Sequence, residues 1–293
     1  MNANRLAPRY LYSLITILFC LGFMTPSFSS AGVEPSGPLP ADKPGDQGIK
    51  LPAAFPILGL KTMLRVSVAS DGSQSWDDSS FPSISADGRY VAFHSIADNL
   101  VPEDTNGAPD VFIHDRQTGI TELVSFSTGG VQGNLTSKDP SISTDGRFVA
   151  FWSYASNLVP GDTNGLGDVF VRDRQTGETK RVSVTSSGGQ SCGDHPSISA
   201  DGRYVAFQSI CTNLLPHDGN YLSDVFVHDR QTGTTEIASI ASESTQGNGE
   251  SSAPAISGDG RFVAFESTST NLVPGDTNTF KDLFVHDRQT GLT

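Results

Sequence analysis

The chain repeats one unit of nearly constant length four times, and this repetition limits the folds open to it. The units open at Pro82, Pro140, Pro196 and Pro254, so that successive openings are 58, 56 and 58 residues apart. Their first residues read PSISADGRYVAF, PSISTDGRFVAF, PSISADGRYVAF and PAISGDGRFVAF. Self-similarity at a fixed period is typical of repeat architectures, in which each unit buries its apolar surface against its neighbours.

Each unit contains four segments with the character of β-strands, in which β-branched or aromatic residues alternate with other side chains. In the first unit these segments are the Ser-Ile-Ser around Ile84, Arg89 to Ser95, Asp110 to His114, and Thr121 to Phe126. Asp87-Gly88 predicts a two-residue hairpin between the first two, because Asp and Gly tolerate positive φ. The Gln-Thr-Gly that ends at Gly119 predicts the turn between the last two. No segment of the repeats has a helical period.

A four-stranded antiparallel unit repeated in tandem predicts an all-β fold, a β-propeller whose blades are the four repeats. The Asp-Gly-Arg-x-Val-Ala-Phe segments resemble the Ser-Pro-Asp-Gly-x-x-Ile-Ala-Phe repeats of TolB-like propellers, a WD-repeat-like bacterial group, over roughly residues 61 to 293. The chain departs from that pattern in its longer units and in the residue before Asp-Gly, which is Ala86, Thr144, Ala200 or Gly258 instead of proline. The resemblance implies a propeller with an interaction role and names no partner.

The number of blades in the ring is left open by the repeats. The last unit reaches Gly291-Leu292-Thr293, where its fourth strand is expected to begin. The segment Leu64–Val68 precedes the first unit and matches the fourth strand Lys180–Val184 closely. Either this segment completes the last blade and closes a four-bladed ring, or the four repeats are part of a larger propeller.

The N-terminal region has the composition of an export signal followed by a linker. Arg5 and Arg9 precede an apolar stretch from Leu11 to Met24, and small residues at 29–31 offer a cleavage site. We therefore predict a signal peptide at 1–31, a disordered Pro/Gly-rich linker at 32–60 and propeller repeats at 61–293. The apolar stretch is too short for a membrane span, so we expect no transmembrane segment in the mature chain. The signal peptide predicts a periplasmic or secreted location.

The net charge of −13 and a pI near 4.7 exclude one class of partner. A strongly acidic surface repels phosphate backbones, so we expect no binding to nucleic acid. Protein and glycan ligands remain open, and nothing in the sequence indicates the oligomeric state. No cofactor is expected apart from the calcium hypothesis given below.

Register arithmetic predicts a disulfide in the third unit. Its hairpin turn is Asp201-Gly202, so opposed residues sum to 403, and Cys192 and Cys211 meet that sum. Directly opposed residues lie close enough for a disulfide bridge. An exported chain enters an oxidising compartment, in which cysteines pair. The alternatives are two free thiols, or a bulge that spoils the register.

The loops that join the fourth strand to the next first strand, and the second strand to the third, are expected on one face, the long-loop face. These loops differ between units, whereas the tight turns of the other face are nearly identical and are interpreted as structural. Aromatic and charged residues on loops of a rigid scaffold are typical of a binding surface. The predicted binding-face residues are Trp76, Asp78, Phe81, Lys138, Asp139, Asp194, His195 and Glu250.

Three functional interpretations follow from these residues. The first is an exported, non-catalytic platform that binds a protein or another ligand on the long-loop face. The second is a propeller hydrolase or lyase at the channel mouth, for which Asp139 and His195 from adjacent blades are the best candidate pair. The third is a targeting module of a longer enzyme.

The loop before each third strand has the pattern Asp-x-Asn-x-x-x-Asp, which gives a calcium hypothesis. Oxygen ligands at alternate positions on a loop suit Ca²⁺, although this pattern lacks the fifth-position acid and the distal Glu of a calcium loop. The alternative is that Asp and Asn organise the loop through Asx turns. The residues are Asp104, Asn106, Asp110, Asp162, Asn164, Asp168, Asp218, Asn220, Asp224, Asp276, Asn278 and Asp282.

Two further repeated positions carry charge or imidazole. His114, His228 and His286 share one position of the third strand, at which the second unit has Arg172, and we expect them to face outward. Arginines also follow each Asp-Gly turn, beginning with Arg89, and we expect weak surface ion pairs there.

Overall fold

The computed structural model describes residues 63–216 and 218–293, so the predicted signal peptide at 1–31 and linker at 32–60 lie outside the described residues. The described residues form fifteen strands in four antiparallel sheets. A helix long and apolar enough to cross a membrane is not found within residues 63–216 and 218–293.

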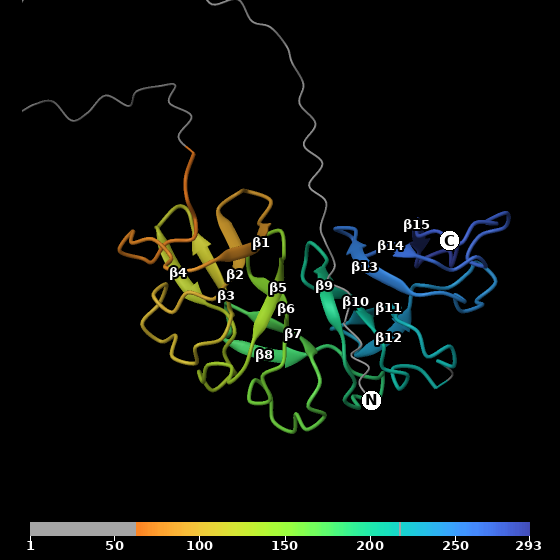
Figure 1. Ribbon diagram of the computed structural model, residues 1–293, viewed down its shortest axis with the longest axis horizontal. Coiled ribbons are helices and arrows are strands. Elements are labelled where there is room, and N and C mark those ends of the chain that lie inside the picture. The colour runs from red at the N-terminus through yellow and green to blue at the C-terminus, as the bar shows by residue number, and fades with distance from the viewer. Residues whose placement is uncertain (1–62, 217) are drawn as a thin grey trace, which may run out of the picture. The chain divides into compact units, whose positions relative to one another are not determined.

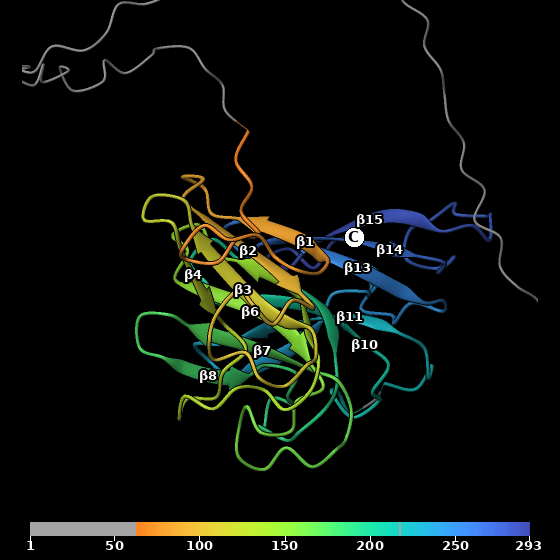
Figure 2. The same ribbon diagram turned by 60° about the vertical axis from the view of Figure 1, so that its left-hand side comes forward.

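Each sheet contains the strands of one repeat in sequence order, and the sheets follow one another in chain order (Figures 1 and 2). The first sheet has β1 (Ser79–Ile84), β2 (Tyr90–Ser95), β3 (Asp110–Asp115) and β4 (Ile120–Leu123). The second has β5 (Ser137–Ile142), β6 (Phe148–Ser153), β7 (Asp168–Asp173) and β8 (Glu178–Arg181). The third has β9 (Asp194–Ile198), β10 (Tyr204–Ser209), β11 (Asp224–Asp229) and β12 (Thr234–Ile237), and the fourth has β13 (Ser251–Ile256), β14 (Phe262–Ser267) and β15 (Asp282–Asp287).

The predicted all-β blade architecture is confirmed, and the closure left open by the sequence is not formed in this structure. The segment Leu64–Val68 lies against the first blade, because the hydroxyl of Thr121 in β4 donates to the carbonyl of Val68. Ser70 adds two hydrogen bonds to the backbone of Thr121. In the part of the chain that the structure describes, β15 has no fourth strand beside it.

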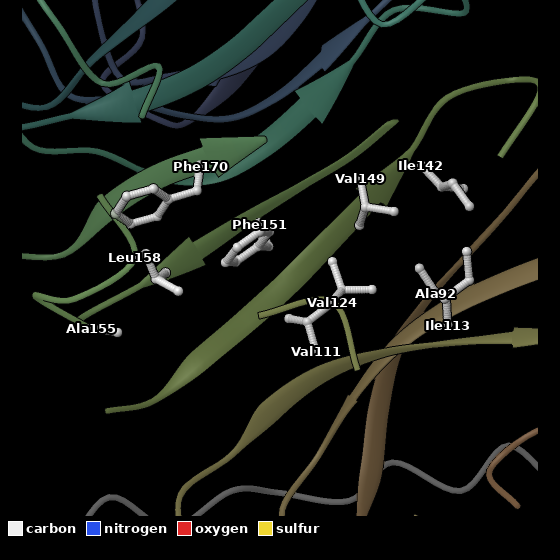
Figure 3. Packing of buried hydrophobic residues seen from close by; sticks show 10 residues of the cluster. All are labelled: Ala92, Val111, Ile113, Val124, Ile142, Val149, Phe151, Ala155, Leu158 and Phe170. Carbon is white, nitrogen blue, oxygen red and sulfur yellow. The ribbon is translucent and has the colours of Figure 1, made fainter. Parts of the chain in front are cut away.

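The core lies between neighbouring blades rather than inside any one of them. One face of the first blade contributes Ala92, Val111, Ile113 and Val124, as Figure 3 shows. They pack against the opposite face of the second blade, on which Ile142, Val149, Phe151, Ala155, Leu158 and Phe170 are buried. The same contact recurs between the second and third blades and between the third and fourth. Since full burial of one such side chain is worth about 1.5 to 3 kcal/mol, each blade is stabilised mainly by its neighbours.

On the tight-turn face, neighbouring blades are joined by a glycine and an aromatic ring. Gly146 of the second blade packs against the ring of Tyr90. An added Cβ at Gly146 would be 2.2 Å from the nearest ring carbon. The ring is held between two guanidinium groups, Arg89 of its own blade at 4.7 Å and Arg174 of the next blade at 4.5 Å. Such cation–π contacts add to the apolar burial. The Asp-Gly turns therefore also serve as contact surfaces between blades.

The arginines after these turns pair with aspartates at the end of the third strand. Arg89 makes a bidentate contact with Asp115, with Nη2–Oδ2 at 2.7 Å and Nε–Oδ1 at 3.0 Å. Asp115 is buried, and Arg89 holds the pKa of its carboxyl well below the usual range. The pairs lie at the surface, as expected, because the arginine side chains remain 35 to 39% exposed. The fork of the guanidinium also matches the carboxylate, so the pair ties β2 to β3. The equivalent pairs are Arg147–Asp173, Arg203–Asp229 and Arg261–Asp287.

The expectation that the third-strand histidines face outward is also wrong. His114 is buried, and its Nδ1 lies 2.9 Å from the hydroxyl oxygen of Thr121. That hydroxyl in turn bonds the segment before the first blade, so the histidine supports a contact between consecutive units. Burial lowers the pKa of His114, and it lowers that of His228 to about 4. These side chains are neutral structural groups at neutral pH.

A matched pair of glycine variants tests the contact between blades. Gly202 and Gly233 have nearly the same φ, 73° and 78°, but an added Cβ meets the Phe148 ring at 2.1 Å in the first case and open space in the second. We expect Gly233→Ala to lower the free energy of unfolding by about 1 kcal/mol, the cost of the left-handed backbone. Gly202→Ala should cost about 3 kcal/mol, because overpacking is added to that strain. Denaturant unfolding of both variants measures the difference, and equal losses would contradict this account.

Candidate functional site

The long-loop face is assembled by an asparagine from each unit. Asn99, in the loop after β2, donates through Nδ2 to the carbonyl of Gln74, which lies in the loop before β1, at 2.7 Å. The same bond joins the equivalent loops of the other units, from Asn157, Asn213 and Asn271. The two classes of long loop therefore lie on one face, as the sequence predicted.

Four first-strand residues on this face share an unusual backbone conformation. Phe81, Asp139, His195 and Ala253 each precede the proline that opens a unit, and each has φ between 48° and 53°. The register of the first strand shifts at each of these positions, which marks a β-bulge. Positive φ in a residue with a side chain costs of order 1 to 3 kcal/mol, and bulges re-aim side chains. The scaffold thus presents one side chain per blade in the same way, and the side chain differs each time.

Two of the bulge residues, Asp139 and His195, each belong to a histidine–carboxylate pair. Phe81 stacks on His94, with ring centroids 5.2 Å apart. His94 Nδ1 lies 4.0 Å from a carboxylate oxygen of Asp139 in the next blade. His195 Nδ1 lies 3.4 Å from a carboxylate oxygen of Asp194. The pair expected from the sequence, Asp139 with His195, is therefore not a direct contact: each residue has a different partner.

The pKa values of His94 and His195 are shifted in opposite directions. Burial lowers the pKa of His94, although Asp139 partly opposes this effect. The hydrogen bond with Asp194 raises the pKa of His195, and the charge of Asp139 raises it further. The face therefore carries a neutral imidazole beside Asp139 and a second imidazole that holds its proton more readily.

A second row of variable residues lies on the second strands, which neighbour the first strands that carry the four bulge residues. It occupies one position of the second strands, at which the blades carry His94, Trp152, Gln208 and Glu266. Our sequence reasoning missed this row, although the signal is present: the Phe before and the Ser after this position are the same in all four units, and the residue between them differs in each. Trp152 lies directly on Gly167, where an added Cβ would be 2.2 Å from its indole nitrogen. A residue larger than glycine would displace the indole.

Trp152 forms one wall of a pocket of about 350 Å³ in the long-loop face. Tyr154 meets it edge-on with ring centroids 4.7 Å apart, and Leu166, Ile210 and Asp194 complete the lining. Tyr154, Leu166 and Ile210 are exposed although they are large and apolar. The pocket offers an apolar anchor site with a carboxylate beside it.

A disulfide between Cys192 and Cys211 holds the loop that borders this pocket. Val205 opposes Ile198, which fits the sum of 403, but beyond the bulge at His195 the register is lower by one. The bulge named as an alternative is present, and the cysteines still meet with Cα atoms 5.7 Å apart.

The remaining predicted binding-face residues do not line the pocket. Lys138 is opposite Trp152 in the register of β5 and β6. Trp76 is exposed, and its backbone N–H donates to Asn99. Asp78 and Glu250 are exposed in their loops.

In the first unit, the Asp-x-Asn-x-x-x-Asp loop is organised by internal hydrogen bonds. Asn106 donates to Asp110 at 2.7 Å and accepts from the backbone N–H of Ala108. The amide of Gln132 bridges Asp104 and Asp110, at 2.9 Å from an oxygen of each. Groups of three or more His, Cys, Asp and Glu side chains suited to a metal do not occur within the described ranges. Calcium in this loop would require these N–H groups to turn away, which favours the Asx-turn interpretation.

In the second unit a guanidinium takes part in the same arrangement. Arg181 Nη1 lies 3.3 Å from Asp162 and 3.2 Å from Asp168. In the first unit Leu123 stands at the position of Arg181, and burial raises the pKa of Asp110 to about 6. Asp104 also has its pKa raised by burial.

The fold and the repeats define a repeat protein built from β-propeller blades. No family model matches the chain, and no curated protein matches its sequence. Among solved structures it is similar to TolB from Acinetobacter baumannii, at 19% identity and a TM-score of 0.45 over 74% of this chain and 42% of that one. It is also similar to a protein described as a TolB from Agrobacterium tumefaciens, at 17% identity and a TM-score of 0.46 over 74% and 61%.

An oligogalacturonate lyase from Vibrio parahaemolyticus has the same kind of similarity, at 16% identity and a TM-score of 0.41 over 70% of this chain and 50% of that one. The chain thus spans less than two thirds of each of these proteins. Identities this low bear on the fold alone.

Thermal unfolding tests the calcium hypothesis. An ion that binds only the folded state raises the unfolding midpoint by mass action. Because N–H and O–H donors already engage the carboxylates, we expect the same midpoint in millimolar Ca²⁺ and in excess chelator. A saturable rise that Asp104→Asn abolishes would instead assign the loop as a calcium site.

The buried carboxyl of Asp110 predicts a pH dependence of stability. Its pKa is raised on folding, so its contribution is fully present below about pH 4 and is lost as the pH rises through about 6. We expect wild type to lose stability relative to Asp110→Asn over this window, by on the order of 3 kcal/mol. Denaturant unfolding from pH 4 to 7 measures it.

Asp115→Asn supplies a control of opposite sign. The folded pKa of Asp115 is depressed, so its contribution is present above about pH 4 and is lost at more acid pH. A flat difference between wild type and Asp110→Asn from pH 4 to 7 would refute a raised pKa at Asp110.

Proposed function

We propose that the chain is an exported, non-catalytic binding module whose long-loop face holds a segment of a partner protein. The observation that carries this proposal is the contrast between scaffold and surface. The turns, the blade contacts and the arginine–aspartate pairs repeat in every unit, whereas the residues at the four bulges differ. A rigid frame with variable side chains at fixed positions is the usual design of a recognition surface.

The chemistry of the face favours a partner segment with an apolar side chain next to basic residues. The pocket of Trp152, Tyr154, Leu166 and Ile210 accepts an apolar group, and aromatic residues in pockets are typical anchors. Asp194 lies at this pocket, and the chain as a whole has a net charge of −13. An acidic surface speeds the encounter with a basic partner, which favours a protein segment over a neutral glycan.

Among the described residues, no hydrogen bond joins the imidazole of His94 or His195 to a hydroxyl or thiol, which disfavours the hydrolase or lyase interpretation. The side chain stacked on His94 is that of Phe81, and His195 is bonded to Asp194. Catalysis by such a pair needs a hydroxyl, thiol or substrate proton within hydrogen-bond reach of the imidazole. A targeting role in a longer protein would use the same binding face, so it does not compete with the proposal.

Peptide arrays test the proposed function. The probes are short peptides with a central Leu or Trp flanked by Lys and Arg, each paired with a twin in which Glu replaces the basic residues. We expect binding to the basic set alone, weaker at high salt, because charge screening reduces long-range attraction. The double change Tyr154→Ser and Ile210→Ser should reduce binding at least tenfold, since both residues line the pocket.

Ile120→Ser is the matched control, because Ile120 is as exposed as Tyr154 but begins β4 beside the tight turn. It should leave peptide binding unchanged. Binding to immobilised neutral glycans with no response to the peptides would contradict the proposal. Turnover of peptide or polygalacturonate substrates that His94→Ala abolishes would contradict its non-catalytic part.

A further inference from the structure

The pocket beside Trp152 lies at the junction of the second and third blades, and departures from the repeat form both of its walls. The second-blade wall depends on Gly167, on which Trp152 lies, because the other units have proline, serine or lysine at this position. In the third blade, the loop at residues 190–196 is two residues shorter than its equivalents at 74–82, 132–140 and 246–254. The walls of the pocket therefore belong to this junction and not to the repeat.

The shorter loop removes a backbone hydrogen bond that the other three units share. In the second unit the N–H of Tyr154 donates to the carbonyl of Thr136 at 3.0 Å, and the first and fourth units repeat this bond from Ile96 and Thr268. Ile210 holds the same position in the third unit, and no backbone acceptor for its N–H is found within the described residues. The residue that forms the third-blade wall thus lacks the anchor of its equivalents.

An asparagine side chain also fixes this loop in the second and fourth units. Asn134 accepts from the N–H of Ser156 at 3.0 Å and donates to the hydroxyl of Ser156 at 3.2 Å. Asn248 makes the same two bonds with Thr270. The corresponding loop of the third unit, at residues 190–196, contains no asparagine. Its attachment must therefore come from other groups.

The disulfide stands where these hydrogen bonds are missing. Cys211 replaces an alanine of the first two units, and its N–H bonds the hydroxyl of Ser209 as the N–H of Ala155 bonds that of Ser153. The sulfur of Cys211 is joined to Cys192, which itself lines the pocket. A covalent link thus replaces the backbone and asparagine bonds of the other units.

Two hydrogen bonds attach the rest of this loop. Nδ2 of Asn213 donates to the carbonyl of Gln190 at 2.8 Å, and the hydroxyl of Ser191 donates to Oδ1 of Asn213 at 2.7 Å. Both bonds hold the chain after Cys211, whereas Ile210 precedes it and lines the pocket. The position of Ile210 is therefore set by the end of β10 on one side and by the bridge on the other.

We propose that the Cys192–Cys211 bridge is a redox-sensitive positioning element of the pocket, so that a dithiol reductant releases the loop at Ile210 and weakens ligand binding. In that step the S–S bond becomes two thiols, and the dithiol gives up two electrons and two protons as its own sulfurs form a disulfide. Cys211 is half-buried in a surface loop, so a dissolved reductant reaches the bridge. This inference rests on the binding function proposed for the same pocket.

The third blade itself does not depend on the bridge. Its first two strands are paired through Val205 with Ile198 and through Ala206 with Ser197, away from both cysteines. Val205 and Ile198 are also buried in the core shared with the second blade. Reduction should therefore change the pocket and leave the sheet intact.

Peptide binding by the full chain, before and after reduction with dithiothreitol, tests the proposal. The probe is a fluorescently labelled basic peptide with a central Leu. We expect about tenfold weaker binding after reduction, because an unfixed wall adds an ordering cost to binding. The double variant Cys192→Ser with Cys211→Ala is the matched control: it should bind as weakly as the reduced protein and show no response to dithiothreitol. Equal affinity of the oxidised and reduced wild type overturns the proposal.

A second readout needs no ligand. The chain has two tryptophans, so Trp76→Phe leaves Trp152 as a reporter in the pocket wall. We expect reduction to raise the Stern–Volmer constant for acrylamide quenching of Trp152, because release of Ile210 opens the pocket. The same constant in both redox states overturns the proposal, even for a protein that binds no peptide, which by itself contradicts only the proposed function. Loss of the β-sheet circular dichroism signal on reduction overturns it as well, since the bridge would then hold the fold.

Discussion

The contact between neighbouring blades is the interaction on which the rest of the structure depends. A single four-stranded sheet here has apolar side chains on both faces, such as Val111 on one and Phe112 on the other, and it cannot bury both alone. Packing one blade on the next buries them together, and the same solution is repeated three times. The Gly–aromatic–Arg contact on the tight-turn face fixes the approach of the blades, because a side chain at Gly146 would collide with Tyr90. Stability in such an array is approximately a sum of nearest-neighbour terms.

The residues of the proposed binding face are not the ones that stabilise the frame. Within each unit, the arginine after the hairpin turn and its aspartate tie the second strand to the third, while the asparagine of the long loop ties the two loop classes together. These bonds hold the frame independently of the residues at the bulges. The bulged positions are therefore free to carry Phe81, Asp139, His195 or Ala253 at the same backbone geometry.

The two ends of the array follow from the same physics. Each internal blade is covered on both sides, but the first and last blades each have one side without a neighbour among the described residues. The side chains left uncovered, Ile84 at one end and Leu283 at the other, belong to the two halves of one repeated contact surface.

By itself the sequence determined the features that depend on neighbours within one unit. The strands, the Asp-Gly hairpins and the partnership of Cys192 with Cys211 follow from local spacing and register, and the structure contains all of them. Only the tertiary structure decided which residues of neighbouring units come into contact. His94 meets Asp139, 45 residues further on, and buried His114 supports a bond to the preceding segment, because these contacts depend on how one blade is rotated on the next. Periodicity along the chain specifies that blades repeat, whereas the packing of their faces sets that rotation.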